Sequence, residues 1–477
     1  MAEGRMLQFV RLAQQQPPKR TVSARREDFA EIYKDFAPAE AGTQASRCSQ
    51  CGIPFCQVHC PLNNNIPDWL KLTAENRLQE AYELSSATNT FPEICGRICP
   101  QDRLCEGNCV IEKDFESVTI GAVERFITDT AWENGWIKPI APVRERAQSV
   151  GIIGAGPGGL AAAERLRSQG YQVHVYDRYD RVGGLMIYGI PGFKLEKDVV
   201  LRRWKWLEEG GIQFHLGVEI GKTITFAELR AKHDAVLIGT GVYKARDIGG
   251  PGAGLGGIVA AMDFLTVSNR QGLGDAVPEF DDGSLNAEGK RVVVIGGGDT
   301  AMDCVRTAVR QGAASVKLLY RRDKANMPGS MREVKNAEEE GVEFVWLSAP
   351  ESFYGDGSVT GVRVQKMRLG MPDASGRQSV LPGDEHVTIE ADLVIKALGF
   401  DPEELPALWD QPGLEVSRWG TLKTDHRTAM TTLPGVFAAG DIVRGASLVV
   451  WAIRDGRDAA ARMHDYMQQH AMAAAAE

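Results

Sequence analysis

Eight of the nine cysteines lie between Cys48 and Cys109, and this density restricts what that part of the chain can become more than any other feature. They form two runs, one with Cys48, Cys51, Cys56 and Cys60, the other with Cys95, Cys99, Cys105 and Cys109. In a reducing compartment, clustered cysteines are metal ligands more often than disulfides. Eight thiolates match the ligand set of two 4Fe-4S clusters, so the sequence predicts that all eight bind iron.

Zinc is the main alternative metal, because a Cys-x2-Cys spacing also suits tetrahedral zinc sites. The remaining gaps of three to five residues are less typical of zinc and favour iron–sulfur clusters. Spacing does not divide the ligands between two clusters, since each cluster can take cysteines from both runs. Hydrophobic residues between the cysteines, such as Ile53, Phe55 and Ile94, are expected to limit the access of water.

The bulk composition describes a globular protein of several domains. The chain has 477 residues, 43% of them hydrophobic. Since a domain typically has about 150 residues, this length predicts roughly three domains. The N-terminus lacks the apolar core of a signal peptide and no apolar run could span a bilayer, so a soluble cytoplasmic protein without membrane contact is expected. The net charge of −9 and the lack of a dense Lys/Arg stripe argue against nucleic acid.

Two kinds of pattern divide the chain. Up to about residue 146 the pattern is helical, for example over 67–72 and 122–132, with the cysteines in loops. From Val150, and again from Arg291, a hydrophobic strand is followed by a glycine turn and a helix, the signature of a βαβ unit. The predicted fold class is α/β, with two Rossmann-like dinucleotide-binding domains preceded by an α-helical iron–sulfur domain.

The first glycine turn contains Gly154, Gly156, Gly158 and Gly159 between a strand and a helix. Glycines at these positions let backbone N–H groups approach a pyrophosphate, and the helix N-terminus attracts its charge. Asp177, at the end of the next strand, is placed to accept hydrogen bonds from a ribose. The strand, the glycine turn, the helix and Asp177 together predict a dinucleotide site.

The identity of this nucleotide depends on two further segments. Gly184 and Leu185, and later Gly440 and Asp441, resemble the additional flavin contacts of flavoproteins with two dinucleotide domains. In those proteins the late aspartate binds the ribityl and phosphate region, so FAD is expected here. A helix expected over 447–464 would point its N-terminus at the isoalloxazine and stabilise negative charge on the reduced ring.

The second glycine turn contains Gly296, Gly297 and Gly298, followed by Asp299 and Thr300. Asp299 and Thr300 either cap the helix that starts here or contact the ligand directly. The next strand ends in Arg321 and Arg322 rather than in an acid. Guanidinium groups can pair with a 2′-phosphate, so NADPH is favoured over NADH. Cys304, on the helix that directly follows this glycine turn, is expected to be a small buried residue.

A glycine–aspartate motif over 435–441 predicts that the chain returns to the first Rossmann-like unit after completing the second, so that one domain is inserted in the other. The expected domains are 1–146 for the helical domain with two 4Fe-4S clusters, 147–285 plus 415–477 for the FAD-binding domain, and 286–414 for the NADPH-binding domain.

Nearly the whole chain resembles the small (beta) subunits of bacterial NADPH-dependent glutamate synthase. The resemblance is carried by CSQCGIPFC at 48–56, CGRICPQDRLCEG at 95–107, YGIP at 188–191, GGGDTAMDCVR at 296–306, NMPG at 326–329 and AGDIVRG at 439–445. Much of the pattern is also similar to the electron-entry region of dihydropyrimidine dehydrogenase. There a glutamine ligates one cluster, at the position that corresponds to Glu124. With eight cysteines present, Glu124 is expected beside a cluster or on the surface.

The resemblance implies an oxidoreductase acting on CH–NH2 donors, with NADPH passing hydride to FAD and single electrons moving through the clusters to FMN. That FMN belongs to a large (alpha) subunit, which also carries a glutaminase, and the hetero-oligomer forms L-glutamate from L-glutamine and 2-oxoglutarate in ammonia assimilation. No catalytic acid or base is implied in this chain, because its task is to hold nicotinamide C4 against flavin N5.

Two other functions are consistent with parts of the pattern. One is an NADPH oxidoreductase of the same family with ferredoxin or another redox subunit as acceptor, because the cofactors do not identify the acceptor. The other is a binding or scaffold protein that is stabilised by zinc and that uses a bound dinucleotide for sensing.

Overall fold

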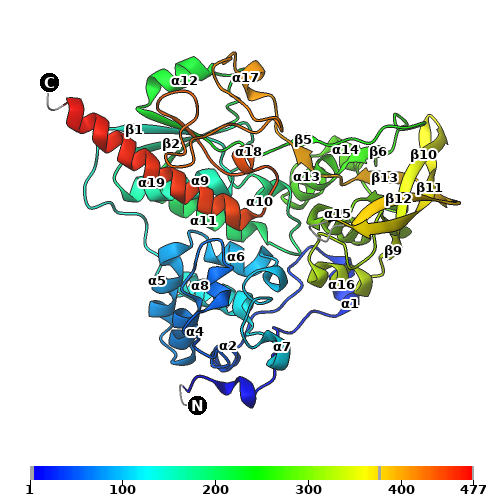
Figure 1. The fold of residues 1–477 in the computed structure, drawn as a ribbon, viewed down its shortest axis with the longest axis horizontal. Helices are drawn as coiled ribbons and strands as arrows, with labels where there is room; N and C mark the ends of the chain where they lie inside the picture. Colours follow the sequence, from blue (N-terminus) through cyan, green and yellow to red (C-terminus); the bar gives the residue numbers. More distant parts are fainter. Residues whose placement is uncertain (1–4, 374–377, 475–477) are drawn as a thin grey trace.

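The computed structural model describes residues 5–373 and 378–474, which form a helical unit and two Rossmann-like units (Figure 1). The helical unit carries both cysteine runs and lies next to the first Rossmann-like unit. Its 3₁₀ helices and α-helices are η1 (Gln8–Val10), α1 (Val22–Glu27), α2 (Pro38–Ala45), α3 (Phe55–Val58), α4 (Ile66–Ala74), α5 (Leu78–Thr88), α6 (Pro92–Ile98), η2 (Gln101–Arg103), α7 (Glu112–Phe115) and α8 (Ile120–Glu133). The helices expected over 67–72 and 122–132 are α4 and α8, each slightly longer than expected.

The first Rossmann-like unit is built on a parallel five-stranded sheet in the order β15-β4-β1-β2-β3. Its strands are β1 (Ser149–Ile153), β2 (Gln172–Asp177), β3 (Gln213–Leu216), β4 (Ala235–Ile238) and β15 (Val436–Ala438). Its helices are α9 (Pro157–Ser168), α10 (Leu185–Tyr188), α11 (Lys197–Glu209), α12 (Phe226–Lys232), α17 (Leu405–Leu408), α18 (Asp441–Arg444) and α19 (Val449–Ala474). Because β15 completes this sheet after a long excursion, the chain does return to the first unit.

The second Rossmann-like unit has its own parallel sheet, in the order β6-β13-β7-β8-β9. The strands are β6 (Ile258–Ala260), β7 (Arg291–Ile295), β8 (Ser315–Tyr320), β9 (Glu343–Trp346) and β13 (Leu393–Lys396), and the helices are α13 (Ala261–Gly272), α14 (Pro278–Asp281), α15 (Asp299–Arg310) and α16 (Met331–Glu339). An antiparallel sheet of β10 (Ser348–Asp356), β11 (Ser358–Pro372) and β12 (Gln378–Glu390) extends from this unit (Figure 1).

The two Rossmann-like units are joined by a short antiparallel pair, β5 (Lys244–Ala245) with β14 (Phe400–Asp401). Strand β6 belongs to the second sheet, ahead of the boundary expected at residue 286. On the return, Leu405 and Trp409 pack in a core with Val236 and Phe226 of the first unit, ahead of the boundary expected at 415. Both differences arise because short segments take their place from long-range pairing and packing, which have no local signature.

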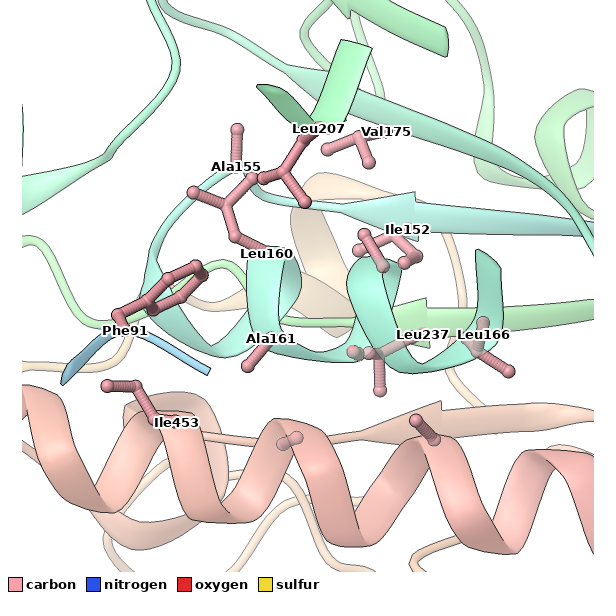
Figure 2. Close-up of a cluster of buried hydrophobic side chains, with 14 of the residues drawn as sticks. Phe91, Ile152, Ala155, Leu160, Ala161, Leu166, Val175, Leu207, Leu237 and Ile453 are labelled. Atoms are coloured by element: carbon pink, nitrogen blue, oxygen red, sulfur yellow. The ribbon is translucent and has the colours of Figure 1, made fainter. Parts of the chain in front are cut away.

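The helical unit shares a hydrophobic core with the first Rossmann-like unit. Phe91 is fully buried among residues of that unit, beside Leu160 of α9 and Ile453 of α19 (Figure 2). Cys95 belongs to the same core. Burying an aromatic side chain of this size contributes about 1.5–3 kcal/mol. This continuous core fixes the cysteine-bearing helix α6 against the first nucleotide unit.

Helices α9 and α19 approach each other closely at two glycines. A Cβ atom on Gly456 of α19 would lie 2.0 Å from the carbonyl oxygen of Gly158 in α9. We expect Gly456→Ala to lower the melting temperature, because the clash of about 1–3 kcal/mol exceeds the roughly 1 kcal/mol gained in helix propensity. Thermal unfolding followed by circular dichroism measures this effect.

Gly272→Ala is the control, since Gly272 is also a helical glycine, the last residue of α13, but nothing lies within 4 Å of its Cβ position. It is expected to leave the melting temperature unchanged or to raise it slightly. Equal melting temperatures for the Gly456 variant and the unmodified chain would show that the helix contact is not tight.

Within the described residues, no helix is both long and apolar enough to cross a membrane.

Candidate functional site

The first glycine turn follows β1 and leads into α9. Gly154 has φ 107°, and a Cβ atom there would lie 2.4 Å from the carbonyl oxygen of Gly239. A Cβ on Gly159 would lie 2.0 Å from the carbonyl oxygen of Gly154, so this position requires close packing of helix on strand. At Gly156 nothing lies within 4 Å of the Cβ position. The turn is therefore closed on the protein side and open where a pyrophosphate would lie.

Asp177 ends β2 beside this turn. Its carboxylate accepts hydrogen bonds from the backbone N–H groups of Ala155 at 2.6 Å and Tyr179 at 2.8 Å. Burial raises the pKa of Asp177, while these N–H donors act in the opposite direction. The carboxylate lines a cavity of about 80 Å³ next to Gly154. This position matches the one expected for a ribose-binding acid.

The same cavity contains residues that no sequence motif had indicated. The Arg178 guanidinium lies 4.8 Å from the centre of the Tyr243 ring and 5.4 Å from that of Tyr179, and it pairs with Glu403 at 2.8 Å. Planar groups stacked in this way offer surfaces for an adenine or ribose. Arg178 directly follows Asp177, which is a usable sequence signal, whereas Glu403 reaches the site only through the fold.

The later flavin-associated residues lie near the first glycine turn. Gly184 has φ 54°, and its Cβ position lies 2.9 Å from the Cα of Gly156. Cβ positions on Gly158 and Gly440 each lie 3.8 Å from the Cβ of Ala452 in α19. Asp441 follows Gly440, and burial raises its pKa to about 6. Segments far apart in sequence thus converge at the carboxyl edge of the first sheet, where such folds bind ligands.

The central cavity lies where the three units meet and has a volume of about 230 Å³. Leu185 lines it from the first nucleotide unit and Thr300 from the second, Cys95 and Cys99 from the helical unit, and Val449 from the first turn of α19. The helix expected over 447–464 is α19, which begins at Val449 and runs further than expected. A flavin, a nicotinamide and a cysteine-bound cluster could all reach this cavity.

Lys194 and Asp303 form a charged pair in the wall of the central cavity, with Nζ 2.9 Å from Oδ1. Burial raises the pKa of Asp303 to about 6. Neither residue was expected in the site from the sequence. Lys194 comes shortly after YGIP and Asp303 shortly after the second glycine turn, but their pairing across two units has no local signal.

The second glycine turn repeats the geometry of the first. Gly296 has φ 147°, with its Cβ position 2.2 Å from the carbonyl oxygen of Ala397, while nothing lies within 4 Å of the Cβ position of Gly298. A Cβ on Gly297 would lie 2.4 Å from the Tyr320 ring, so this glycine is required for packing. Buried Ala301 occupies the third small position. This turn is also open toward a phosphate.

The residues after the second turn have distinct positions. Gly298, not Asp299, is the N-cap of α15, and Asp299 Oδ1 accepts a hydrogen bond from the backbone N–H of Ser330 at 3.0 Å. Arg321 is exposed directly after β8, and Arg322 has a buried Nε without a hydrogen-bond partner. A buried unpaired guanidinium N–H is costly unless a ligand accepts from it. The arginine pair therefore fits a phosphate.

The cysteines form two groups that do not follow the two runs. Cys48, Cys51, Cys56 and Cys109, here called the outer quartet, lie close enough for every pair of thiols to interact electrostatically. Burial, together with these neighbours, raises the pKa of Cys56 to about 12. Cys109 comes from the second run but joins three members of the first. A bound cluster would hold these groups as thiolates.

The inner quartet consists of Cys60, Cys95, Cys99 and Cys105. They line one small cavity, and neighbouring thiols interact in a ring from Cys60 through Cys95 and Cys99 to Cys105. Cys95 and Cys99 also line the central cavity. Cys105 interacts with Cys56 of the outer quartet, so the two groups adjoin. The order from the central cavity is therefore inner quartet, then outer quartet.

Glu124 lies in the cavity of the inner quartet and is not a surface residue. Its Oε1 accepts hydrogen bonds from Asn64 at 3.1 Å and Asn89 at 3.0 Å. Burial raises the pKa of Glu124 to about 7. A polar group in this position can adjust the charge around a cluster.

The hydrophobic residues between the cysteines do not all shield them as expected. Ile94 is buried, but Ile53 and Phe55, which stand between cysteines of the first run, are 69% and 48% exposed. Cys304 is fully buried in α15, as expected. Within the described ranges, no group of three or more His, Cys, Asp and Glu side chains is spaced to hold a single metal ion.

Two family models match the chain. The model described as dihydropyrimidine dehydrogenase domain II, 4Fe-4S cluster, matches residues 25–136, which contain all eight clustered cysteines. The model described as pyridine nucleotide-disulphide oxidoreductase matches residues 148–456, which contain both glycine turns. The two matches divide the chain where the helical unit gives way to β1.

Full-length relatives and a solved structure agree with this division. The glutamate synthase (NADPH) small chain of Azospirillum brasilense is 67% identical over 99% of this chain and 98% of its own. The protein of the same name from Escherichia coli K12 is 45% identical over 97% of this chain and 98% of its own. The structure of Mycobacterium tuberculosis FprA in complex with NADPH has a TM-score of 0.58 at 21% identity, covering 69% of this chain and 86% of FprA, and is similar in fold.

Proposed function

This chain belongs to the family of glutamate synthase (NADPH) small chains, and from that membership we propose that it delivers electrons from NADPH to a large subunit carrying FMN and a glutaminase. The complex would form L-glutamate from L-glutamine and 2-oxoglutarate. The single observation that carries this proposal is the central cavity, which is lined by Leu185 of the first nucleotide unit, Thr300 of the second and Cys99 of the inner quartet.

The cofactor set of FAD, 4Fe-4S clusters and NADPH agrees with both matched family models and with the open glycine turns. When bound, FAD supplies the conversion from a two-electron donor to one-electron acceptors. We assign the first turn, Asp177, Gly184 and Asp441 to FAD, the second turn with Arg321 and Arg322 to NADPH, and one cluster to each cysteine quartet.

The residues of the chain would hold and orient the reactants. The first turn of α19 contributes Val449 and Val450 to the central cavity, where its N-terminal N–H groups favour negative charge. The apolar core around Phe91 keeps the inner quartet in place beside this cavity. The large gain available from orientation, about 7–11 kcal/mol, makes a catalytic acid or base unnecessary.

Two measurements test the proposal. An anaerobic visible spectrum with iron analysis is expected to show flavin over an iron–sulfur shoulder, with about eight iron atoms per chain, and bleaching by NADPH in preference to NADH. Mixing the chain with purified large subunit, NADPH, glutamine and 2-oxoglutarate is expected to yield glutamate. Zinc in place of iron, or bleaching by NADPH without glutamate formation, would count against the proposal.

The surface beside the outer quartet fits a protein partner. Ile53, Phe55, Val58 and Val110, here called the outer patch, are 69%, 48%, 58% and 53% exposed and lie next to Cys51, Cys56 and Cys109 in sequence. Apolar groups that cluster on a surface mark interaction sites. We propose that the large subunit docks on the outer patch, because electrons leaving the outer quartet must cross a short distance to their acceptor.

Ile53→Asp and Val58→Asp are each expected to weaken binding of the large subunit about tenfold or more, because a charge replaces an apolar contact at the interface. Binding is measured by titrating labelled large subunit, with iron content and NADPH-dependent dye reduction unchanged. Met371→Asp is the control, since Met371 is 87% exposed on β11, away from the helical unit (Figure 1). Equal affinities for all three variants would exclude the outer patch.

A further inference from the structure

The second nucleotide unit contacts the helical unit at two places: at α1, where Arg25 pairs with Glu339 at 2.9 Å, and at the loop that follows α6. The contact at this loop adjoins the cysteines. The Asp102 carboxylate accepts hydrogen bonds from Ser330 Oγ at 3.0 Å and from the backbone N–H of Met331 at 3.2 Å. Met331 is the first residue of α16, and its N-cap Ser330 makes no side-chain capping bond within its own unit. An acid of the helical unit therefore caps a helix of the nucleotide unit and complements its dipole.

Arg332 strengthens the same contact. Its guanidinium donates to Gln101 Oε1 and to Glu106 Oε2, each at 2.8 Å. Such charge-assisted bonds from one planar group restrict the relative orientation of two units more than a single contact does. Asp102, Glu106, Ser330 and Arg332 are here called the latch.

On the helical side, the latch residues lie within, and directly after, the peptide between two inner cysteines. Asp102 lies between Cys99 and Cys105, and Glu106 follows Cys105. The turn is tight, since a Cβ atom on Gly107 would lie 1.9 Å from the carbonyl oxygen of Asp102. Gln101 Nε2 donates to the carbonyl oxygen of Cys95 at 3.3 Å. A displacement of the latch must therefore move the backbone that carries Cys95, Cys99 and Cys105.

On the nucleotide side, the latch is bonded directly to the second glycine turn. The backbone N–H of Ser330 donates to Asp299 Oδ1 at 3.0 Å, and that of Gly329 donates to the carbonyl oxygen of Gly297 at 3.0 Å. Asp299 and Gly297 flank Gly298, where the turn is open. A ligand bound at this turn would therefore contact residues that are joined to the latch segment by a single hydrogen bond.

We propose that the latch couples occupancy of the second nucleotide site to the redox state of the cluster in the inner quartet. The inference rests on the proposed function for the presence of that cluster and of NADP(H). The latch residues are positioning residues, because they act through the backbone of Cys95, Cys99 and Cys105 and through the second glycine turn; Ser330 and Arg332 also line the central cavity. The two equilibria are thermodynamically linked. If the nucleotide has different affinities for the chain with an oxidised and with a reduced cluster, its binding must shift the midpoint potential of that cluster by the same free energy.

The test measures the midpoint potential of the inner cluster by EPR in the isolated chain, with and without saturating NADP⁺. A coupling factor of five, at the lower end for allosteric systems, corresponds to about 40 mV for one electron at 59 mV per tenfold. The unmodified chain is expected to show a shift of at least that size. Asp102→Asn and Arg332→Gln, which remove one charge each from the latch, are expected to reduce the shift to less than half.

Glu338→Gln is the matched control, because it removes a carboxylate from the same helix whose partner Lys324 belongs to its own unit. It is expected to keep the full shift. Should a charge variant fail to assemble its cluster, Ser330→Ala decides the question, since it deletes only a hydroxyl contact to Asp102. A shift of full size in the variants, or no shift in the unmodified chain, overturns the proposal. An absence of iron or of flavin bleaching by NADPH would instead refute the proposed function.

Discussion

Replacing Cys99 with serine is expected to abolish glutamate formation while leaving NADPH-dependent flavin reduction in place. Cys99 lines both the central cavity and the cavity of the inner quartet, so it lies between the proposed site of hydride transfer and the proposed path of electrons to the outer quartet. Loss of one thiolate destabilises the inner cluster, and electrons then stop after the flavin. Glutamate formation with the large subunit should fall by at least about 100-fold, since even indirect changes around metal sites cost 10–100-fold.

The measurement combines iron analysis, EPR of the reduced protein, flavin bleaching by NADPH and glutamate formation. Cys304→Ser is the matched control, because Cys304 is buried in α15 of the second nucleotide unit and belongs to neither quartet. It is expected to retain about eight iron atoms per chain and full coupling. Unchanged iron content and glutamate formation in the Cys99 variant would remove Cys99 from the electron path.

Changing both Arg321 and Arg322 to alanine is expected to remove the preference for NADPH. Their guanidinium groups are expected to pair with the 2′-phosphate, and hydrogen bonds to charged groups contribute about 1.5–3 kcal/mol each. The value of kcat/KM for NADPH should fall at least about 100-fold, while the value for NADH stays within about threefold of the original. Steady-state reduction of an artificial dye by each nucleotide measures both values.

Lys324→Ala provides the control for this variant. Lys324 lies in the same segment but pairs with Glu338 at 2.6 Å, so its loss should leave the NADPH/NADH ratio unchanged. A parallel loss of activity with both nucleotides in the double variant would indicate damage to the fold. An unchanged ratio would show that the 2′-phosphate is bound elsewhere.

The local parts of the site could be predicted from the sequence because they depend on neighbouring residues. A glycine turn between strand and helix is recognisable from its spacing, and the structure shows why Gly154 and Gly296 have to be glycines, since their Cβ positions fall within 2.4 Å and 2.2 Å of carbonyl oxygens. The burial of Cys304 follows from its apolar neighbours on one helix. Short-range sterics determine these features, so little else in the chain can alter them.

Other features depend on contacts between distant segments and could not be predicted. Strand β6 precedes the expected boundary because its three residues gain their place only by pairing with β13. Glu403 meets Arg178 where the chain returns to the first unit, and Asp303 meets Lys194 through the packing of the two nucleotide units. Glu124 was expected beside a cluster or on the surface, and only the packing around α8 decides that it is buried.

The α/β class, the two glycine turns and the dense set of thiols could all be predicted from residue type and short spacing, because each depends on residues that are neighbours along the chain. Which thiols lie together depends on the fold of the helical unit. Cys109 joins the outer quartet and Cys60 the inner one, contrary to their order in the two runs. That exchange depends on how the helical unit folds back on itself and packs Phe91 and Cys95 against the first nucleotide unit, which burial of apolar surface drives and local spacing does not record.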